Sequence, residues 1–130
     1  MKIPQVAKDK LMPWFTSWEL DQARISIVPC LPPNVWAMTF GNRILIRRDK
    51  WNLEIEGVAR IGHELVHSRA YRQMGPVPFL ARYCWDAVRL WRRPWNTWPL
   101  EAPAYKVQHE IETSLELKQR EAMSLRLKDA

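Results

Sequence analysis

Two histidines flank a glutamate at helical spacing in the string His63-Glu64-Leu65-Val66-His67. Residues four apart in an α-helix lie on one face, one turn apart, so both imidazoles can reach a single ion. Imidazole suits Zn²⁺, which prefers tetrahedral sites of nitrogen, oxygen and sulfur. Glu64 projects beside such a site, where it can take a proton from a water whose pKa the metal lowers towards about 7. The spacing therefore predicts a zinc centre with Glu64 as general base.

A catalytic zinc centre needs a third protein ligand and keeps its fourth position open. Gln73 stands six residues after His67, so the third ligand must come from further along the chain. Glu101 is the preferred candidate, because it lies at the start of a predicted helix that returns beside the first one. A carboxylate is also favourable at any helix start, so position alone does not decide. The other candidates are Asp86, His109, Glu110 and Glu112.

A centre that attacks a carbonyl group with such a water also needs a donor for the charge that develops on the carbonyl oxygen. Tyr105 lies four residues after Glu101, on the same helix face, and is the candidate donor. Tyr71, four residues after His67, and His109 are alternatives. Each tyrosine can equally be a core aromatic whose hydroxyl is satisfied, and His109 can be a surface residue.

The elements that must position these residues follow from the hydrophobic pattern. Residues 23–28 alternate apolar and polar side chains, which is typical of a half-buried strand. Two β-prone runs, 35–40 and 43–47, flank Gly41-Asn42 and predict a tight hairpin. Helices are then predicted from Asn52 to Gly75, over 78–92, and from near residue 100 to about 127. The order predicts an α+β fold, a small antiparallel β-meander followed by three helices.

The length of 130 residues suits a single domain, with a core over about 22–127. Residues 8–20 are loosely patterned and read as one short helix interrupted at Pro13. No apolar run reaches the roughly 18 to 20 residues of a membrane span, and the first residues lack a signal-peptide stretch. Cys30 and Cys84 have neither disulfide nor ligand spacing, so two buried thiols in a reducing, cytoplasmic compartment are expected.

The net charge of +6 resides in the middle of the chain, where residues 41–95 hold 11 Lys and Arg against 5 Asp and Glu. Eight tryptophans accompany it, and tryptophan can stack on bases or sit at a lipid interface. No zinc-ribbon, RNA-binding or helix-turn-helix signature is present. We therefore favour a solvated basic face over a Trp-rich core, with a nucleic-acid partner as the less favoured alternative. The last 20 residues alternate in charge, as in a solvated helix or a dimerising arm, so oligomeric state stays open.

Several segments together resemble a gluzincin-type metallopeptidase, the group with His-Glu-x-x-His and a downstream glutamate that includes thermolysin. More closely, the chain resembles small bacterial and phage metallopeptidase-like domains. These are related to the peptidase-like core domain found with extracellular contractile injection systems. The resemblance covers about residues 35–105 and rests on 37–44, 62–67, 71–75, 79–83 and 99–105.

This resemblance implies a zincin-like fold, Zn²⁺ bound by His63, His67 and Glu101, and Glu64 as the general base. It also implies a peptide or protein substrate and a phage or bacterial origin. Such domains often carry glutamine three residues after the second histidine, where this chain has Ala70.

Two functions follow as alternatives. The first is a zinc-dependent metallopeptidase that hydrolyses peptide bonds. The second is a catalytically inactive zincin-like module, structural or binding, with affinity for nucleic acid or an acidic partner through its central basic region. The small size motivates the second, because little chain remains to build a substrate cleft.

Overall fold

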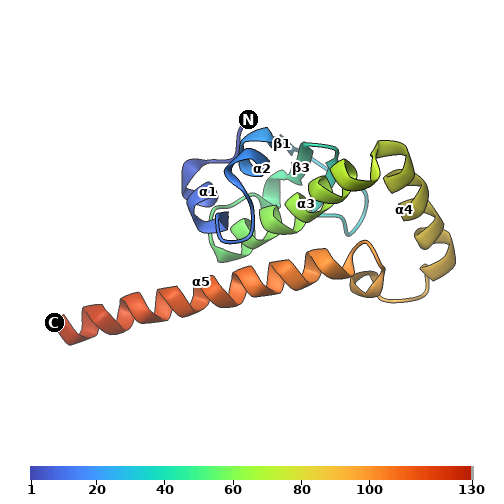
Figure 1. The fold of residues 1–130 in the computed structure, drawn as a ribbon. Helices are drawn as coiled ribbons and strands as arrows, with labels where there is room; N and C mark the ends of the chain where they lie inside the picture. Colours follow the sequence, from blue (N-terminus) through green and yellow to red (C-terminus); the bar gives the residue numbers. More distant parts are fainter. Residues whose placement is uncertain (130) are drawn as a thin grey trace.

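A computed structural model describes residues 1–129 of the chain (Figure 1). Within these residues, five α-helices and a three-stranded sheet confirm the predicted mixture of helix and sheet, with helix predominating. The helices are α1 (Gln5–Leu11), α2 (Ser17–Gln22), α3 (Ile55–Met74), α4 (Pro76–Leu90) and α5 (Ala102–Asp129). The strands are β1 (Arg24–Val28), β2 (Ala37–Phe40) and β3 (Arg43–Arg47), and 3-10 turns span Arg48–Lys50 and Trp95–Thr97.

The sheet has the order β1-β3-β2, so the predicted antiparallel meander is wrong. Strands β2 and β3 form the expected antiparallel hairpin, with Gly41 at a φ of 61° in its turn. Strand β1, however, pairs parallel with β3, from Arg24 opposite Arg43 to Val28 opposite Arg47. The connection between β1 and β2 carries the chain past the position next to β1. Strand β3 later occupies that position, between β1 and β2. Alternation of side chains cannot reveal this order, and the consequence is that β2 becomes an edge strand.

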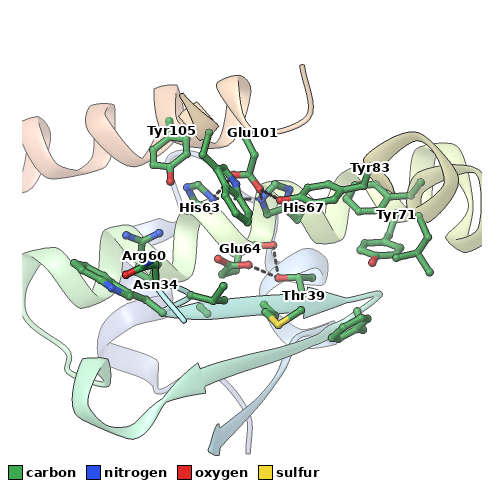
Figure 2. A pocket seen from close by; sticks show the side chains of 18 residues that line it. Asn34, Thr39, Arg60, His63, Glu64, His67, Tyr71, Tyr83, Glu101 and Tyr105 are labelled. Atoms are coloured by element: carbon green, nitrogen blue, oxygen red, sulfur yellow. Dashed lines mark hydrogen bonds and ion pairs between the residues drawn. The ribbon is translucent and has the colours of Figure 1, made fainter. Parts of the chain in front are cut away.

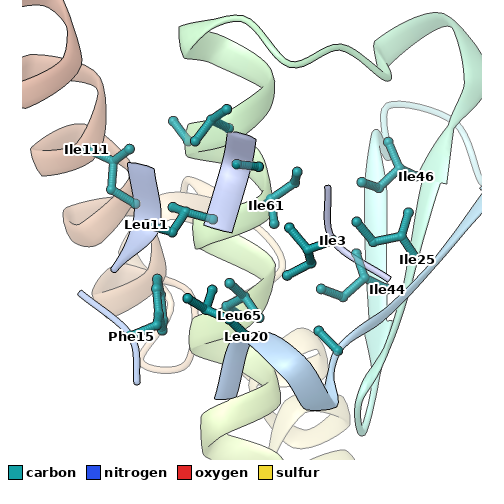
Figure 3. Packing of buried hydrophobic residues seen from close by; sticks show 14 of the residues in the cluster. Ile3, Leu11, Phe15, Leu20, Ile25, Ile44, Ile46, Ile61, Leu65 and Ile111 are labelled. Atoms are coloured by element: carbon teal, nitrogen blue, oxygen red, sulfur yellow. The ribbon is translucent and has the colours of Figure 1, made fainter. Parts of the chain in front are cut away.

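Helix α3 runs through the middle of the body and is buried along most of its length (Figure 1). The side chain of Asn52 binds the start of this helix. Its Oδ1 accepts hydrogen bonds from the backbone N–H groups of Glu54 at 3.0 Å and Gly57 at 3.1 Å. It ends at Gly75, whose φ of 89° suits glycine. Apolar side chains of α3 pack against the sheet on one side and α5 on another (Figure 3). The helix that bears both histidines is therefore held from several directions.

The N-terminal segment contributes to the core more than its pattern indicated. Instead of one helix over 8–20, the chain forms α1 and α2, and Thr16 starts α2 with a capping box to Glu19. The hydrophobic cluster begins well before residue 22 (Figure 3) and includes Ile3, Ala7, Leu11, Phe15 and Leu20. Ile3, Ala7 and Leu11 are spaced four residues apart, so they face the same side and anchor the short helix α1 to the core.

Two expectations about buried residues are wrong. Cys30 and Cys84 are both exposed rather than buried. The core is also not rich in tryptophan, because Trp98 alone among the eight is buried. Branched aliphatic side chains, many of them from the sheet and α3, form the core, and the other seven tryptophans are exposed or partly exposed. Among residues 1–129, no helix combines the length and apolar character that a membrane crossing requires.

Glu19 ties α2 to α3 and makes stability depend on pH. Its carboxylate accepts hydrogen bonds from Arg69 at 2.8 and 2.9 Å and from Arg72 at 2.9 Å. Chiefly through the bonds from Arg69, the pKa of Glu19 falls from its usual 4.5 to about 2. A carboxyl whose pKa is lower in the folded state stabilises the fold above its unfolded pKa, and this contribution is lost as pH falls towards 2.

We therefore expect Glu19→Gln to lower the free energy of unfolding by about 1–2 kcal/mol at pH 7. The difference from wild type should shrink as pH falls from about 5 towards 2, because the Glu19 carboxyl is protonated first in the unfolded chain and then, near pH 2, in the folded one. Urea unfolding over that pH range measures it, with the exposed Glu116→Gln on α5 as control. A difference that stays constant with pH would contradict the ion-pair explanation.

Candidate metal centre

His63 and His67 of α3 meet Glu101, the residue just before α5, in a buried group (Figure 2). His63 Nε2 lies 3.0 Å from Glu101 Oε2, and His67 Nε2 lies 3.1 Å from Glu101 Oε1. The two Nε2 atoms are 3.3 Å apart. All three residues are at most 6% exposed. Among the described residues, these three form the group of His, Cys, Asp or Glu that can hold a metal ion.

The hydrogen bonds of His63 determine which of its nitrogens faces this group. Its Nδ1 lies 2.9 Å from Gln108 Oε1, and Gln108 Nε2 donates to Glu112 Oε1 at 3.3 Å. With its amide oriented by Glu112, Gln108 presents an oxygen, which can only accept, so His63 Nδ1 carries the proton. In neutral His63, the lone pair of Nε2 then points towards His67 and Glu101. Metal-binding histidines are typically oriented in this way.

This convergence of acceptor atoms favours positive charge. Burial raises the pKa of Glu101, but its contacts with the imidazoles of His63 and His67 outweigh burial and leave the pKa below its usual range. Burial lowers the pKa of His67, yet its bond to Glu101 and the charges of Glu64 and Glu101 together outweigh burial, and the pKa is raised. Facing lone pairs in a buried site repel one another unless a proton or a metal cation lies between them. The donor set and its charge therefore fit a bound cation.

Tyr83 of α4 holds the carboxylate of Glu101 and was not predicted as a site residue. Its hydroxyl donates to Glu101 Oε1 at 2.8 Å. Burial, and then the charge of Glu101, raise the pKa of Tyr83, so it stays a donor at neutral pH. The turn before Glu101 is anchored by Trp98, whose Nε1 donates to Leu90 O at 3.1 Å. In sequence, Tyr83 is one more apolar-face residue of its helix, which offers no signal for this role.

We expect Tyr83→Phe to weaken binding of Zn²⁺ by about 10–100-fold, as is usual when a partner of a metal ligand is lost. The substitution removes only the hydroxyl that orients Glu101. Competition against a chelating dye measures the affinity. Tyr71→Phe is the matched control, because Tyr71 lines the same cavity and stacks on Phe79 with ring centroids 3.9 Å apart. Equal losses in both variants would contradict a specific role for Tyr83.

Glu64 lies next to the three ligands, between α3 and the edge strand β2 (Figure 2). Its side chain is 3% exposed, and its Oε2 accepts a hydrogen bond of 2.6 Å from Thr39 Oγ1 of β2. This bond immobilises one oxygen of the carboxylate. The sequence predicts residue 39 within the hairpin and indicates no functional role for it, because only the packing of β2 on α3 creates the contact.

A cavity of about 520 Å³ opens over this group. It is bounded by α3, β2, α4 and the start of α5, and most of its wall is apolar or aromatic, including Trp36, Met38, Phe40, Phe79 and Leu80. Arg60, one turn before His63, adds a positive charge, with its guanidinium 5.1 Å from the Trp36 ring centroid. The chain thus does form a concave site despite its small size.

The remaining candidates lie in different places. Tyr105 lines the cavity and packs edge-on against His63, with centroids 4.6 Å apart, and burial raises its pKa. Asp86 is buried but paired with Arg82 and Arg89, each at 3.2 Å.

The other three candidate ligands on α5 do not join the group. His109 and Glu110 are exposed, and Glu112 accepts from Gln108.

One buried atom of the group has no partner. His67 Nδ1 lacks a hydrogen bond within the described part of the chain, and position 70, one turn further on, holds alanine.

Comparison with protein-family models, curated proteins and solved structures finds no match for this chain. The relationship to metallopeptidases therefore stays a prediction from the motifs.

Proposed function

We propose that this chain is a zinc-dependent peptidase of the gluzincin type, with Zn²⁺ bound by His63, His67 and Glu101. One observation carries the proposal: three buried ligand atoms converge beside the carboxylate of Glu64, in a cavity that can admit a substrate. A merely structural metal site has no need of a fourth residue, here the immobilised acid Glu64, next to an open cavity. A zincin-like arrangement, with an edge strand beside the histidine-bearing helix, also agrees with the position of β2.

The separations within the group are compatible with tetrahedral zinc. Tetrahedral zinc with bonds of about 2.0–2.1 Å to nitrogen places two such ligands about 3.3 Å apart. The two imidazole Nε2 atoms are separated by 3.3 Å, and each lies 3.0 or 3.1 Å from an oxygen of Glu101. Three protein ligands from two histidines and one carboxylate are typical of catalytic rather than structural zinc.

The proposed reaction assigns a task to each residue of the cavity. When bound, zinc acts as a Lewis acid and lowers the pKa of water towards about 7. Glu64 accepts the proton of the attacking water and passes it to the leaving amine, while Thr39 keeps its carboxylate in place. Tyr105 stays the candidate donor to the carbonyl oxygen. The free edge of β2 can pair with an extended peptide through backbone hydrogen bonds.

Metal content and peptide cleavage of the untagged protein test this proposal together, since a His-tag would itself bind zinc. We expect one zinc per chain after purification or reconstitution, and cleavage of members of a peptide library that stops when a chelator removes the metal. A chain that binds no zinc would contradict the proposed site. A chain that binds zinc but cleaves nothing would instead support the inactive binding module.

A further inference from the structure

Helix α4 carries an apolar face that nothing in the described chain covers. The helix stands away from the body at one end of α3 (Figure 1). Its exposed apolar residues include Val77 at 76%, Trp85 at 60%, Val88 at 70% and Trp91, just past its end, at 67%. Leu80, Ala81 and Cys84 are exposed beside them. At 3.6 residues per turn these seven positions occupy one arc of about 140°. We call them the outer face of α4.

The opposite side of α4 is already used by the metal centre. Phe79 and Asp86 are buried there, and Tyr83 donates to Glu101. The helix is therefore oriented by its inner side, and the outer face cannot turn inward without breaking the bond that holds a ligand. Large contiguous apolar patches on a protein surface usually mark an interaction site.

The margin of the outer face is positively charged. Between Gly75 and Leu100 the chain has one acidic residue, Asp86, which is 1% exposed and engaged by Arg82 and Arg89. Arg92 and Arg93 follow Trp91 directly in the sequence, and both are exposed. The segment that carries the outer face thus presents exposed arginines and no exposed carboxylate between Gly75 and Leu100.

From these observations we propose that the outer face of α4 binds the surface of an anionic lipid bilayer. Aliphatic and tryptophan side chains insert at the headgroup boundary, and arginines pair with lipid phosphates, which is the pattern of interfacial amphipathic helices. With 15 residues, α4 is about 22 Å long, enough to lie in the interface. Leu80, Tyr83 and the neighbouring Trp95 also line the cavity, so its entrance would lie close to the lipid surface.

Charge and chemistry disfavour two other occupants. In a two-fold dimer the same patch meets itself, so arginines would face arginines with no exposed acid to pair with them. Single-stranded nucleic acid needs a cationic groove with interleaved aromatic rings. The centre of this face is instead aliphatic, at Val77 and Val88. The experiment below distinguishes binding of a second chain or of nucleic acid from binding of lipid.

Vesicle co-sedimentation of the full chain tests the proposal, using phosphatidylcholine alone and an equimolar mixture with phosphatidylglycerol. We expect binding to the anionic vesicles at least about tenfold tighter than to the neutral ones, weakening with salt. Val88→Glu with Trp91→Glu should reduce it by about tenfold or more, and so should Arg92→Glu with Arg93→Glu. Leu127→Glu, at an equally exposed site on α5, is the matched control and should bind like wild type.

The two exposed cysteines allow a second, local readout. An environment-sensitive fluorophore on Cys84, in a Cys30→Ser chain, should brighten when anionic vesicles are added. The same label on Cys30, in a Cys84→Ser chain, should not, because Cys30 follows β1 and lies outside the outer face. Circular dichroism establishes that each variant is folded.

Three results would overturn the proposal. One is vesicle binding that survives both double substitutions in folded protein. Another is tight binding of single-stranded DNA without binding of vesicles. The third is a dimer that Val88→Glu dissociates, again without vesicle binding.

Discussion

Glu64→Gln is expected to reduce peptide cleavage by about 10²–10⁴-fold, the usual contribution of a general base. Glutamine has the same size as glutamate, and its amide oxygen can still accept the hydrogen bond from Thr39 Oγ1. It cannot accept a proton from water at neutral pH, so the loss falls on the chemical step. Zinc binding should persist, because Glu64 does not belong to the converging group of ligand atoms.

The measurement is kcat/KM for a peptide that the wild type cleaves, with zinc content determined on the same preparations. Glu56→Gln makes the same chemical change at an exposed position in the first turn of α3 and should keep wild-type activity. Unchanged cleavage by folded, zinc-loaded Glu64→Gln would show that Glu64 is not the base. It would leave the metal site itself unaffected.

Zinc is expected to stabilise the wild-type chain strongly, since a ligand that binds only the folded state adds to its stability. At a free concentration about a thousandfold above Kd the gain is about 4 kcal/mol. For a chain of this length that corresponds to a rise in Tm of about 10–20 °C. The site binds only when folded, because its ligands come from α3 and from residue 101, which are brought together by tertiary packing.

Glu101→Gln should lose most of this zinc-dependent rise, because a neutral amide is a poor ligand for zinc in place of a carboxylate. The quantity to compare is the difference in Tm with and without zinc, measured by differential scanning fluorimetry. This difference separates metal binding from any direct effect on folding. His109→Ala removes the remaining histidine, which is exposed, and should keep the full rise. An undiminished rise in Glu101→Gln would contradict Glu101 as the third ligand.

The sequence alone predicted the parts of the site that depend on local geometry. His63, Glu64 and His67 lie within one helix, so helical periodicity was sufficient to place both imidazoles on one face. The Gly41-Asn42 turn was equally predictable, since Gly41 adopts the positive φ that such a turn requires. Glu101, the preferred candidate for the third ligand, does lie against the two histidines, and the positions of the other candidates in the fold place them outside this group.

Contacts between distant segments decided the rest. The order of the strands depends on where a long loop crosses the sheet, and it determines that Thr39 of β2 reaches Glu64, 25 residues away. Tyr83 supports Glu101 only because α4 turns back from the end of α3. The hydrophobic pattern predicted a helix over 78–92 but not which side of that helix the body would cover. Local sequence thus specifies turns and helix faces, whereas long-range packing, in which each contact depends on all the others, selects the neighbours of each face.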